Sequence, residues 1–175
     1  MSKRPVEHEQ EASAFYAELN KDVSYFAAIW HVYKVGHLLA TDLDRICRPY
    51  NLSMADVHLL GAVRLDQAGQ LRATDLAHTL HVTNAALSPR IDKLERRGLL
   101  ERVSSTSDSR CSTLKITKDG VAALDAAIED ISARAHFVRC YRGLSSEDQA
   151  HLVRIMGAVH DQLDRDFVAT VRSDN

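Results

Sequence analysis

The apolar side chains of this sequence recur mostly three or four positions apart, which is the spacing of one face of an α-helix. Two such stripes run side by side from Ser24 to Arg48 and stop at Pro49, whose ring cannot continue a helix. A short acidic amphipathic segment over residues 5–20 precedes them. The long helix is therefore either a central core helix or one that packs both inside its own chain and against a partner.

Two helices joined by a tight turn are predicted in the middle of the chain. Ser53 and Asp56 stand at the spacing of a capping box, in which each side chain bonds the backbone amide of the other residue. Gly98 marks a helix end further along. Helices are expected over residues 54–66, 73–80 and 84–97, with a turn at 81–83. The second and third of them form a helix-turn-helix, whose final helix is built to enter a DNA major groove.

A β-hairpin and two further helices complete the predicted order. The expected strands are residues 99–103 and 113–117, on either side of a polar loop at 104–111. A helix capped by Thr117 continues with apolar residues at a helical spacing as far as Val138. A last helix begins at a second capping box, formed by Ser145 and Asp148.

We therefore predict a mainly α-helical fold with a small β-hairpin wing, in which a winged helix-turn-helix is flanked by N- and C-terminal dimerisation helices. The dimerisation helices are inferred from apolar stripes at both chain ends, which the remaining chain is too short to cover. The expected division is residues 1–50 for the N-terminal helices, 51–118 for the DNA-binding domain and 119–175 for the C-terminal helices.

Composition and charge refine this picture. The longest hydrophobic run, Tyr25–Trp30, is far shorter than the about 20 residues of a membrane-spanning helix, so we expect a cytoplasmic protein. Three widely spaced cysteines fit reduced thiols. The net charge of −2 argues against a nucleic-acid partner, but residues 84–118 carry 8 Lys and Arg against 4 Asp and Glu. A basic block in an acidic chain fits a local DNA-binding surface.

Four segments at matching spacing make the sequence similar to the MarR family of transcriptional regulators. They are TDLAHTLHV at 74–82, LSPRIDKLERRGLLER at 87–102, DSR at 108–110 and LKITKDG at 114–120. The resemblance implies a homodimeric, sequence-specific DNA-binding regulator, and specifically a repressor that a small aromatic ligand releases from its operator. A two-fold dimer implies an inverted-repeat operator in double-stranded DNA.

Base reading is expected from exposed residues in the first two turns of the final helix of the helix-turn-helix. These residues are Asn84, Ala85, Ser88 and Pro89. Pro89 would be expected to disturb a helix, but the peroxide-sensing branch of the family has a similar proline, which implies tolerance. The resemblance also implies that Arg110 enters a minor groove and that Asp108 holds its guanidinium. Phosphate contacts, with solvated side chains as the alternative, are predicted for Arg72, Thr74, Lys93, Arg96, Arg102 and Lys115.

The resemblance places a ligand cleft between the first long helix, the helix after Ser53 and the helix after Thr117. The side chains expected there are Trp30, Tyr33, Lys34, His37 and His58. They offer both aromatic surface and polar donors, which is the composition that a ligand site needs. The alternative is that the histidines are hydrogen-bonded structural residues and that Trp30 belongs to the core.

Other functions have weaker support in the sequence. His78 and His81 are three residues apart, but no Cys or carboxylate at a ligand spacing completes a zinc site, so no metal or cofactor is predicted. A redox-responsive regulator of the same fold, acting through Cys111 beside Arg110, stays open as an alternative, as does a metal-responsive one. No nucleophile elbow, phosphate loop or HExxH pattern indicates an enzyme. A helical protein-interaction module is the remaining alternative.

Overall fold

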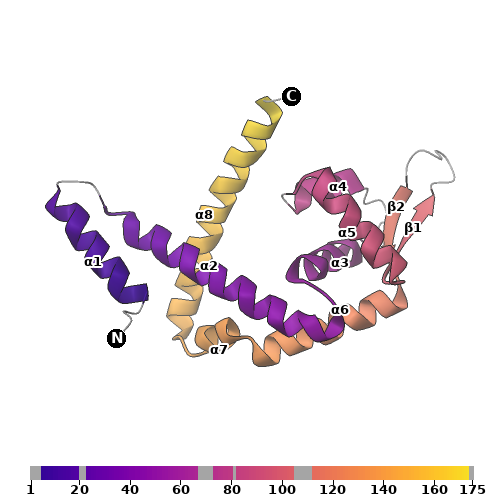
Figure 1. Cartoon of the computed structure of the whole chain (residues 1–175), viewed down its shortest axis with the longest axis horizontal. Helices are drawn as coiled ribbons and strands as arrows, with labels where there is room; N and C mark the ends of the chain where they lie inside the picture. The colour runs from indigo at the N-terminus through magenta and orange to yellow at the C-terminus, as the bar shows by residue number, and fades with distance from the viewer. Residues whose placement is uncertain (1–4, 20–22, 67–72, 81, 105–111, 174–175) are drawn as a thin grey trace. The chain divides into compact units, whose positions relative to one another are not determined.

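Figure 1 shows the computed structural model of the chain, which describes residues 5–19, 23–66, 73–80, 82–104 and 112–173. The helices are α1 (Pro5–Glu18), α2 (Phe26–Cys47), the 3-10 turn η1 (Arg48–Tyr50), α3 (Met54–Leu65), α4 (Ala73–Thr79), α5 (Asn84–Arg96), α6 (Lys118–Arg134), α7 (His136–Arg142) and α8 (Ser146–Ser173). The strands are β1 (Leu100–Ser104) and β2 (Ser112–Ile116). The chain divides into two compact units, residues 1–132 and 133–175. The predicted fold class, mainly helical with a small hairpin, is confirmed.

The N-terminal end of α3 is fixed by the predicted capping box. The Ser53 hydroxyl accepts a hydrogen bond from the Asp56 amide at 3.2 Å, and Asp56 Oδ2 accepts one from the Ser53 amide at 2.9 Å. The amide of Met54 donates to Asp44 of α2 at 2.7 Å. Three of the amides at the start of the helix thus have side-chain acceptors, which holds α3 at a defined place beside the end of α2.

One apolar core joins α3, α4, α5, the hairpin and α6. Its most deeply buried large side chains are Leu59, Leu60, Leu76, Leu87, Ile91, Leu94, Leu100 and Leu124. The two strands pair antiparallel, with Leu100 opposite Ile116 and Ser104 opposite Ser112, and β1 packs beside α5 (Figure 1). The helix-turn-helix and the hairpin therefore share one core.

The start of α6 is attached to the end of α5 by a short chain of hydrogen bonds. The Thr117 hydroxyl donates to the Gly98 carbonyl at 2.6 Å and accepts from the Gly120 amide at 3.0 Å. The Thr117 amide donates to the Leu99 carbonyl at 3.1 Å. Gly98 has a φ of +70°, which glycine adopts without the strain that a side chain would cause.

The structure differs from the predicted elements in one place. The helix expected to run from Thr117 to Val138 is broken, because Ala135 has extended backbone angles (φ −64°, ψ 131°) between α6 and α7. Apolar residues keep their helical spacing across this break, so the sequence pattern did not reveal it. Pro89, in contrast, lies inside α5, so the helix accommodates the proline.

Among the described residues, no helix combines the length and apolar character needed to cross a membrane.

Candidate nucleic-acid interface

The exposed side of α5 carries the residues that sequence reasoning assigned to base reading. Thr83 caps the helix by accepting a hydrogen bond from the Ala86 amide at 3.2 Å. Leu87, Ile91 and Leu94 turn inward and are buried. Asn84, Ala85, Ser88 and Pro89 are all exposed within the first two turns. An amide, a hydroxyl and two small apolar surfaces are thus presented together, a set able to meet base edges and thymine methyl groups.

One flank of α5 is tied to the hairpin by a single guanidinium. Arg102 of β1 donates to Asp92 at 2.6 Å and to Glu95 at 2.5 Å, two carboxylates one turn apart on α5. The hydrogen bond to Asp92 and the negative charge of both carboxylates raise the pKa of Arg102 above its usual value, against a smaller opposing effect of burial. Arg102, a predicted phosphate contact, therefore joins the wing to α5 in this structure.

The other flank of α5 is tied to α3 and to the segment before it. Lys93 Nζ donates to Asp56 Oδ2 at 3.1 Å, and the Asp56 side chain is only 1% exposed. Arg97 donates to the backbone carbonyls of Tyr50 and Asn51 at 2.9 and 2.5 Å. The Lys93 ammonium, predicted to contact phosphate, therefore has a carboxylate partner inside the protein, although the side chain remains 48% exposed.

Asp56 is ionised in spite of its burial. Desolvation raises the pKa of a buried carboxyl, but hydrogen bonds from Ser53 and Lys93 and the charge of Lys93 outweigh this effect, and the pKa of Asp56 lies below its usual value. Arg90 lies on the same flank of α5 as Lys93 and is half-buried. The ion pair holds Lys93 and Asp56 in position on this flank. Arg90 borders the pocket described next.

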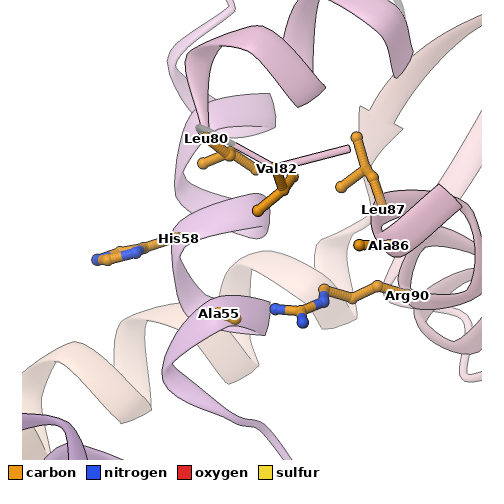
Figure 2. A pocket seen from close by; sticks show the side chains of 7 residues that line it. All are labelled: Ala55, His58, Leu80, Val82, Ala86, Leu87 and Arg90. Atoms are coloured by element: carbon orange, nitrogen blue, oxygen red, sulfur yellow. The ribbon is translucent and has the colours of Figure 1, made fainter. Parts of the chain in front are cut away.

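A small pocket lies between α3, the turn before α5 and α5 itself. It is lined by Ala55, His58, Leu80, Val82, Ala86, Leu87 and Arg90 (Figure 2). The Arg90 side chain reaches across towards Ala55, whereas the imidazole of His58 points away from Arg90. None of these lining residues belongs to α2, so the pocket at His58 is not bounded by the first long helix as expected from the sequence.

The other expected ligand residues lie together on α2. Lys34 Nζ is 4.9 Å from the centroid of the Trp30 ring and 5.6 Å from that of Tyr33, both within reach of a cation–π interaction. Trp30 is half-buried and also stacks on Phe26. Tyr33 and His37 are exposed. The structure therefore brings Trp30, Tyr33 and Lys34 into one aromatic and cationic cluster.

Several predicted residues cannot be placed. Arg72, Asp108, Arg110, His81 and Cys111 lie outside the described residues. Thr74 is in α4, but its side chain is not among those described. In the described part of the chain no three His, Cys, Asp or Glu side chains form a group that could hold a metal ion. Burial, together with the negative charges of Asp44 and Asp56, raises the pKa of the Cys47 thiol, which disfavours its reactive thiolate form.

Comparison with known proteins identifies this arrangement. The model of the MarR family matches residues 52–112, which include the helix-turn-helix and β1. The segment from α3 to β1 is therefore similar to the MarR family of regulators. The HTH-type transcriptional regulator PecS of Dickeya dadantii (strain 3937) is 25% identical over 143 residues, which cover 81% of this chain and 85% of PecS.

Solved structures of MarR-family proteins show the same fold. Sco5413 of Streptomyces coelicolor superposes with a TM-score of 0.69 at 20% identity, covering 81% of this chain and 96% of Sco5413. The MepR–DNA complex of S. aureus gives a TM-score of 0.66 at 19% identity, covering 77% of this chain and 94% of MepR. MarR-family members are transcriptional regulators and not enzymes. This chain is accordingly a DNA-binding transcriptional regulator.

Sequence reasoning missed the contacts of Asp56 and Arg102 with α5, and it missed Arg90 in the wall of the pocket. Asp56 was recognised only as a cap of α3, because its contact with Lys93 joins residues 37 positions apart. Arg102 was assigned to phosphate or solvent, although its fork to Asp92 and Glu95 depends on how β1 lies beside α5. Arg90 was not singled out, although its place four residues after Ala86 puts both on one face of the helix.

Proposed function

We propose that this regulator is a homodimeric repressor that occupies an inverted-repeat operator and is released from it by a small aromatic molecule. The observation that carries the DNA-binding part is the exposed first half of α5, where Asn84, Ala85, Ser88 and Pro89 stand free of the core. Because the target is chromosomal DNA, we place the protein in the cytoplasm. The N- and C-terminal helices form the dimer, and the segment over 51–118 binds DNA.

A two-fold dimer carries two copies of α5, so its operator consists of two half-sites about one helical turn, or 10–10.5 bp, apart. Selection of duplexes from a random pool by the purified protein, followed by footprinting, tests this arrangement. Two protected half-sites in inverted orientation are expected. A single unrepeated protected segment would contradict the symmetry on which the proposal depends.

Release by a ligand is supported by the position of the pocket. Its walls include Ala86, Leu87 and Arg90 of α5, so a molecule seated there changes the environment of the helix that reads DNA. Apolar side chains and one guanidinium are the composition that an aromatic anion requires. The cluster of Trp30, Tyr33 and Lys34 on α2 offers aromatic surface with a cation and is the second place where such a molecule fits.

The test is a screen of aromatic acids, phenols and their thioesters for release of a selected duplex. His58→Ala and Trp30→Ala distinguish the two places. A compound that fails to release only the His58 variant acts at the pocket, and one that fails to release only the Trp30 variant acts on α2. If no compound of these classes releases the wild-type protein, the aromatic effector is wrong. If a compound releases both variants as well as the wild type, neither place is the site.

A further inference from the structure

One oxygen of the Asp56 carboxylate takes part both in the cap of α3 and in a contact with α5. Asp56 Oδ2 accepts the Ser53 amide at 2.9 Å, which completes the cap of α3, and it accepts Lys93 Nζ of α5 at 3.1 Å. The Asp56 side chain is almost fully buried, whereas Lys93 is half-exposed. A buried carboxylate that loses its charged partner is strongly destabilised, so the ammonium of Lys93 is held near α3.

The position of Lys93 along α5 gives this contact its importance. Pro89 has no amide hydrogen, so the backbone hydrogen bond that would link it to the Ala85 carbonyl is missing in the middle of the base-reading segment. Lys93 follows one turn later. Arg102 holds the opposite flank of α5 to the wing through Asp92 and Glu95, and Arg97 holds the end of the helix to the carbonyls of residues 50 and 51. Among the described residues, the contact of Lys93 with Asp56 is the ion pair that anchors α5 directly to α3.

We propose that Asp56 is a positioning residue for sequence-specific DNA binding, and that Lys93 acts as a strut between α3 and α5 instead of contacting phosphate. The pair fixes the angle at which the reading residues meet the groove. This inference rests on the DNA-binding function proposed above. It predicts that loss of either partner lowers discrimination between sequences more than it lowers attraction to DNA in general.

Four variants separate a strut from a phosphate contact. Lys93→Met keeps the aliphatic stem and removes the charge, and Asp56→Asn keeps a cap acceptor and removes the partner. The double variant tests whether the two act together. Ser53→Ala is the matched control, because it removes the other half of the capping box and leaves the Asp56–Lys93 contact in place. Affinity is measured for a duplex selected by the wild-type protein and for a scrambled duplex of equal composition, over a range of salt concentrations.

We expect the ratio of selected to scrambled affinity to fall about tenfold in Lys93→Met and in Asp56→Asn, as for the loss of one good base contact. The double variant should resemble either single one, since both remove the same contact. The salt dependence of Lys93→Met should keep its slope. Ser53→Ala should lose stability and keep the ratio. Asp56→Asn separates discrimination between sequences from general attraction to DNA, because removing a negative charge should strengthen the general attraction.

Three results would overturn the strut. In a two-fold complex, two lost phosphate contacts would lower the salt slope by about 1.8, so such a drop in Lys93→Met with an unchanged ratio assigns Lys93 to phosphate. Additive effects of the two single variants would make the residues independent. An equal fall in the ratio for Ser53→Ala would leave Asp56 only as a cap.

Hydrogen exchange of the free protein makes the test independent of DNA. A strut predicts faster exchange of the α5 amides in Lys93→Met, whereas a phosphate contact predicts no change. If the wild-type protein selects no duplex, the DNA-binding function fails. In that case, unchanged α5 protection in Lys93→Met would also remove the strut, and faster exchange would retain it as a contact that positions α5.

Discussion

At the scale of single residues, the buried Asp56 carboxylate makes stability depend on acidic pH. Its pKa lies below the value of about 3.9 of an unfolded Asp, so the folded state binds fewer protons. Its stabilising contribution is therefore complete above the unfolded pKa and is lost as the pH falls through the folded pKa. We expect Asp56→Asn to cost about 1–3 kcal/mol at pH 7 and to reduce the further loss of stability on going to pH 3.

The measurement is the free energy of unfolding of both proteins at pH 7 and pH 3, at one fixed protein concentration because of the proposed dimer. Asp125→Asn is the control, since Asp125 forms an exposed ion pair with Arg64 and such pairs contribute little. Equal acid sensitivity of Asp56→Asn and the wild type would contradict the role given to this carboxylate.

Gly120 is a position where no side chain fits. An added Cβ would lie 2.1 Å from the Leu99 carbonyl oxygen and 2.8 Å from Ile116 Cγ1, so the start of α6 would have to move away from the wing. We expect Gly120→Ala to destabilise the protein by about 1–3 kcal/mol, as overpacking does in other cores. Gly61→Ala is the matched control, since nothing lies within 4 Å of its added Cβ. Urea unfolding in which both variants had wild-type stability would contradict this reading of the junction.

At the scale of elements, Arg102 connects β1 to α5 through Asp92 and Glu95. Arg102 and both of its carboxylate partners are partly exposed, so we expect Arg102→Met to cost only about 1 kcal/mol of stability. Its effect on affinity for a selected duplex should be larger, because the wing is no longer held against the reading helix. Lys115→Met is the control, since it removes the same charge from a pair with Glu101 inside the hairpin.

Equilibrium binding at two salt concentrations decides between orientation and charge in this pair of variants. A loss of affinity that is the same for Arg102→Met and Lys115→Met would assign the effect to charge alone. A larger loss for Arg102→Met at both salt concentrations is the result expected from a lost connection between wing and helix.

The elements that the sequence predicts well are those with local signals. Ser53 marks the start of α3 through its capping box, Ser145 caps α8 by accepting the Asp148 amide, and Gly98 marks the end of α5. The break at Ala135 was missed because the apolar spacing continues through it and neither proline nor glycine stands there. The exposure of Asn84, Ala85, Ser88 and Pro89 on α5 followed from helical periodicity. The partners of Lys93 and Arg102 did not, because they depend on how distant elements pack.

At the scale of the whole molecule, apolar side chains remain exposed on helices at both ends of the chain. On α8 they are Val153, Ile155, Met156, Val159 and Leu163, each 41–59% exposed. On α2 they are Ile29, Val32, Tyr33 and Leu38. Contiguous exposed apolar surface indicates a protein interface, and an operator with two half-sites requires two copies of α5. A second copy of the chain is therefore the proposed partner of these helices.

A charge placed in the α8 stripe tests this assembly. We expect Val159→Glu to convert the dimer to a monomer at micromolar concentration, because an unpaired carboxylate in an apolar interface is strongly unfavourable. Ala150→Glu adds the same charge to an exposed position on the opposite side of α8 and should leave the dimer intact. Light scattering measures the mass of both variants and of a chain ending near Gly143, which lacks α8. Because each monomer then binds one half-site alone, affinity for the two-half-site duplex should fall more than affinity for a single half-site. A full dimer in Val159→Glu and in the shortened chain would show that α8 does not hold the two copies together.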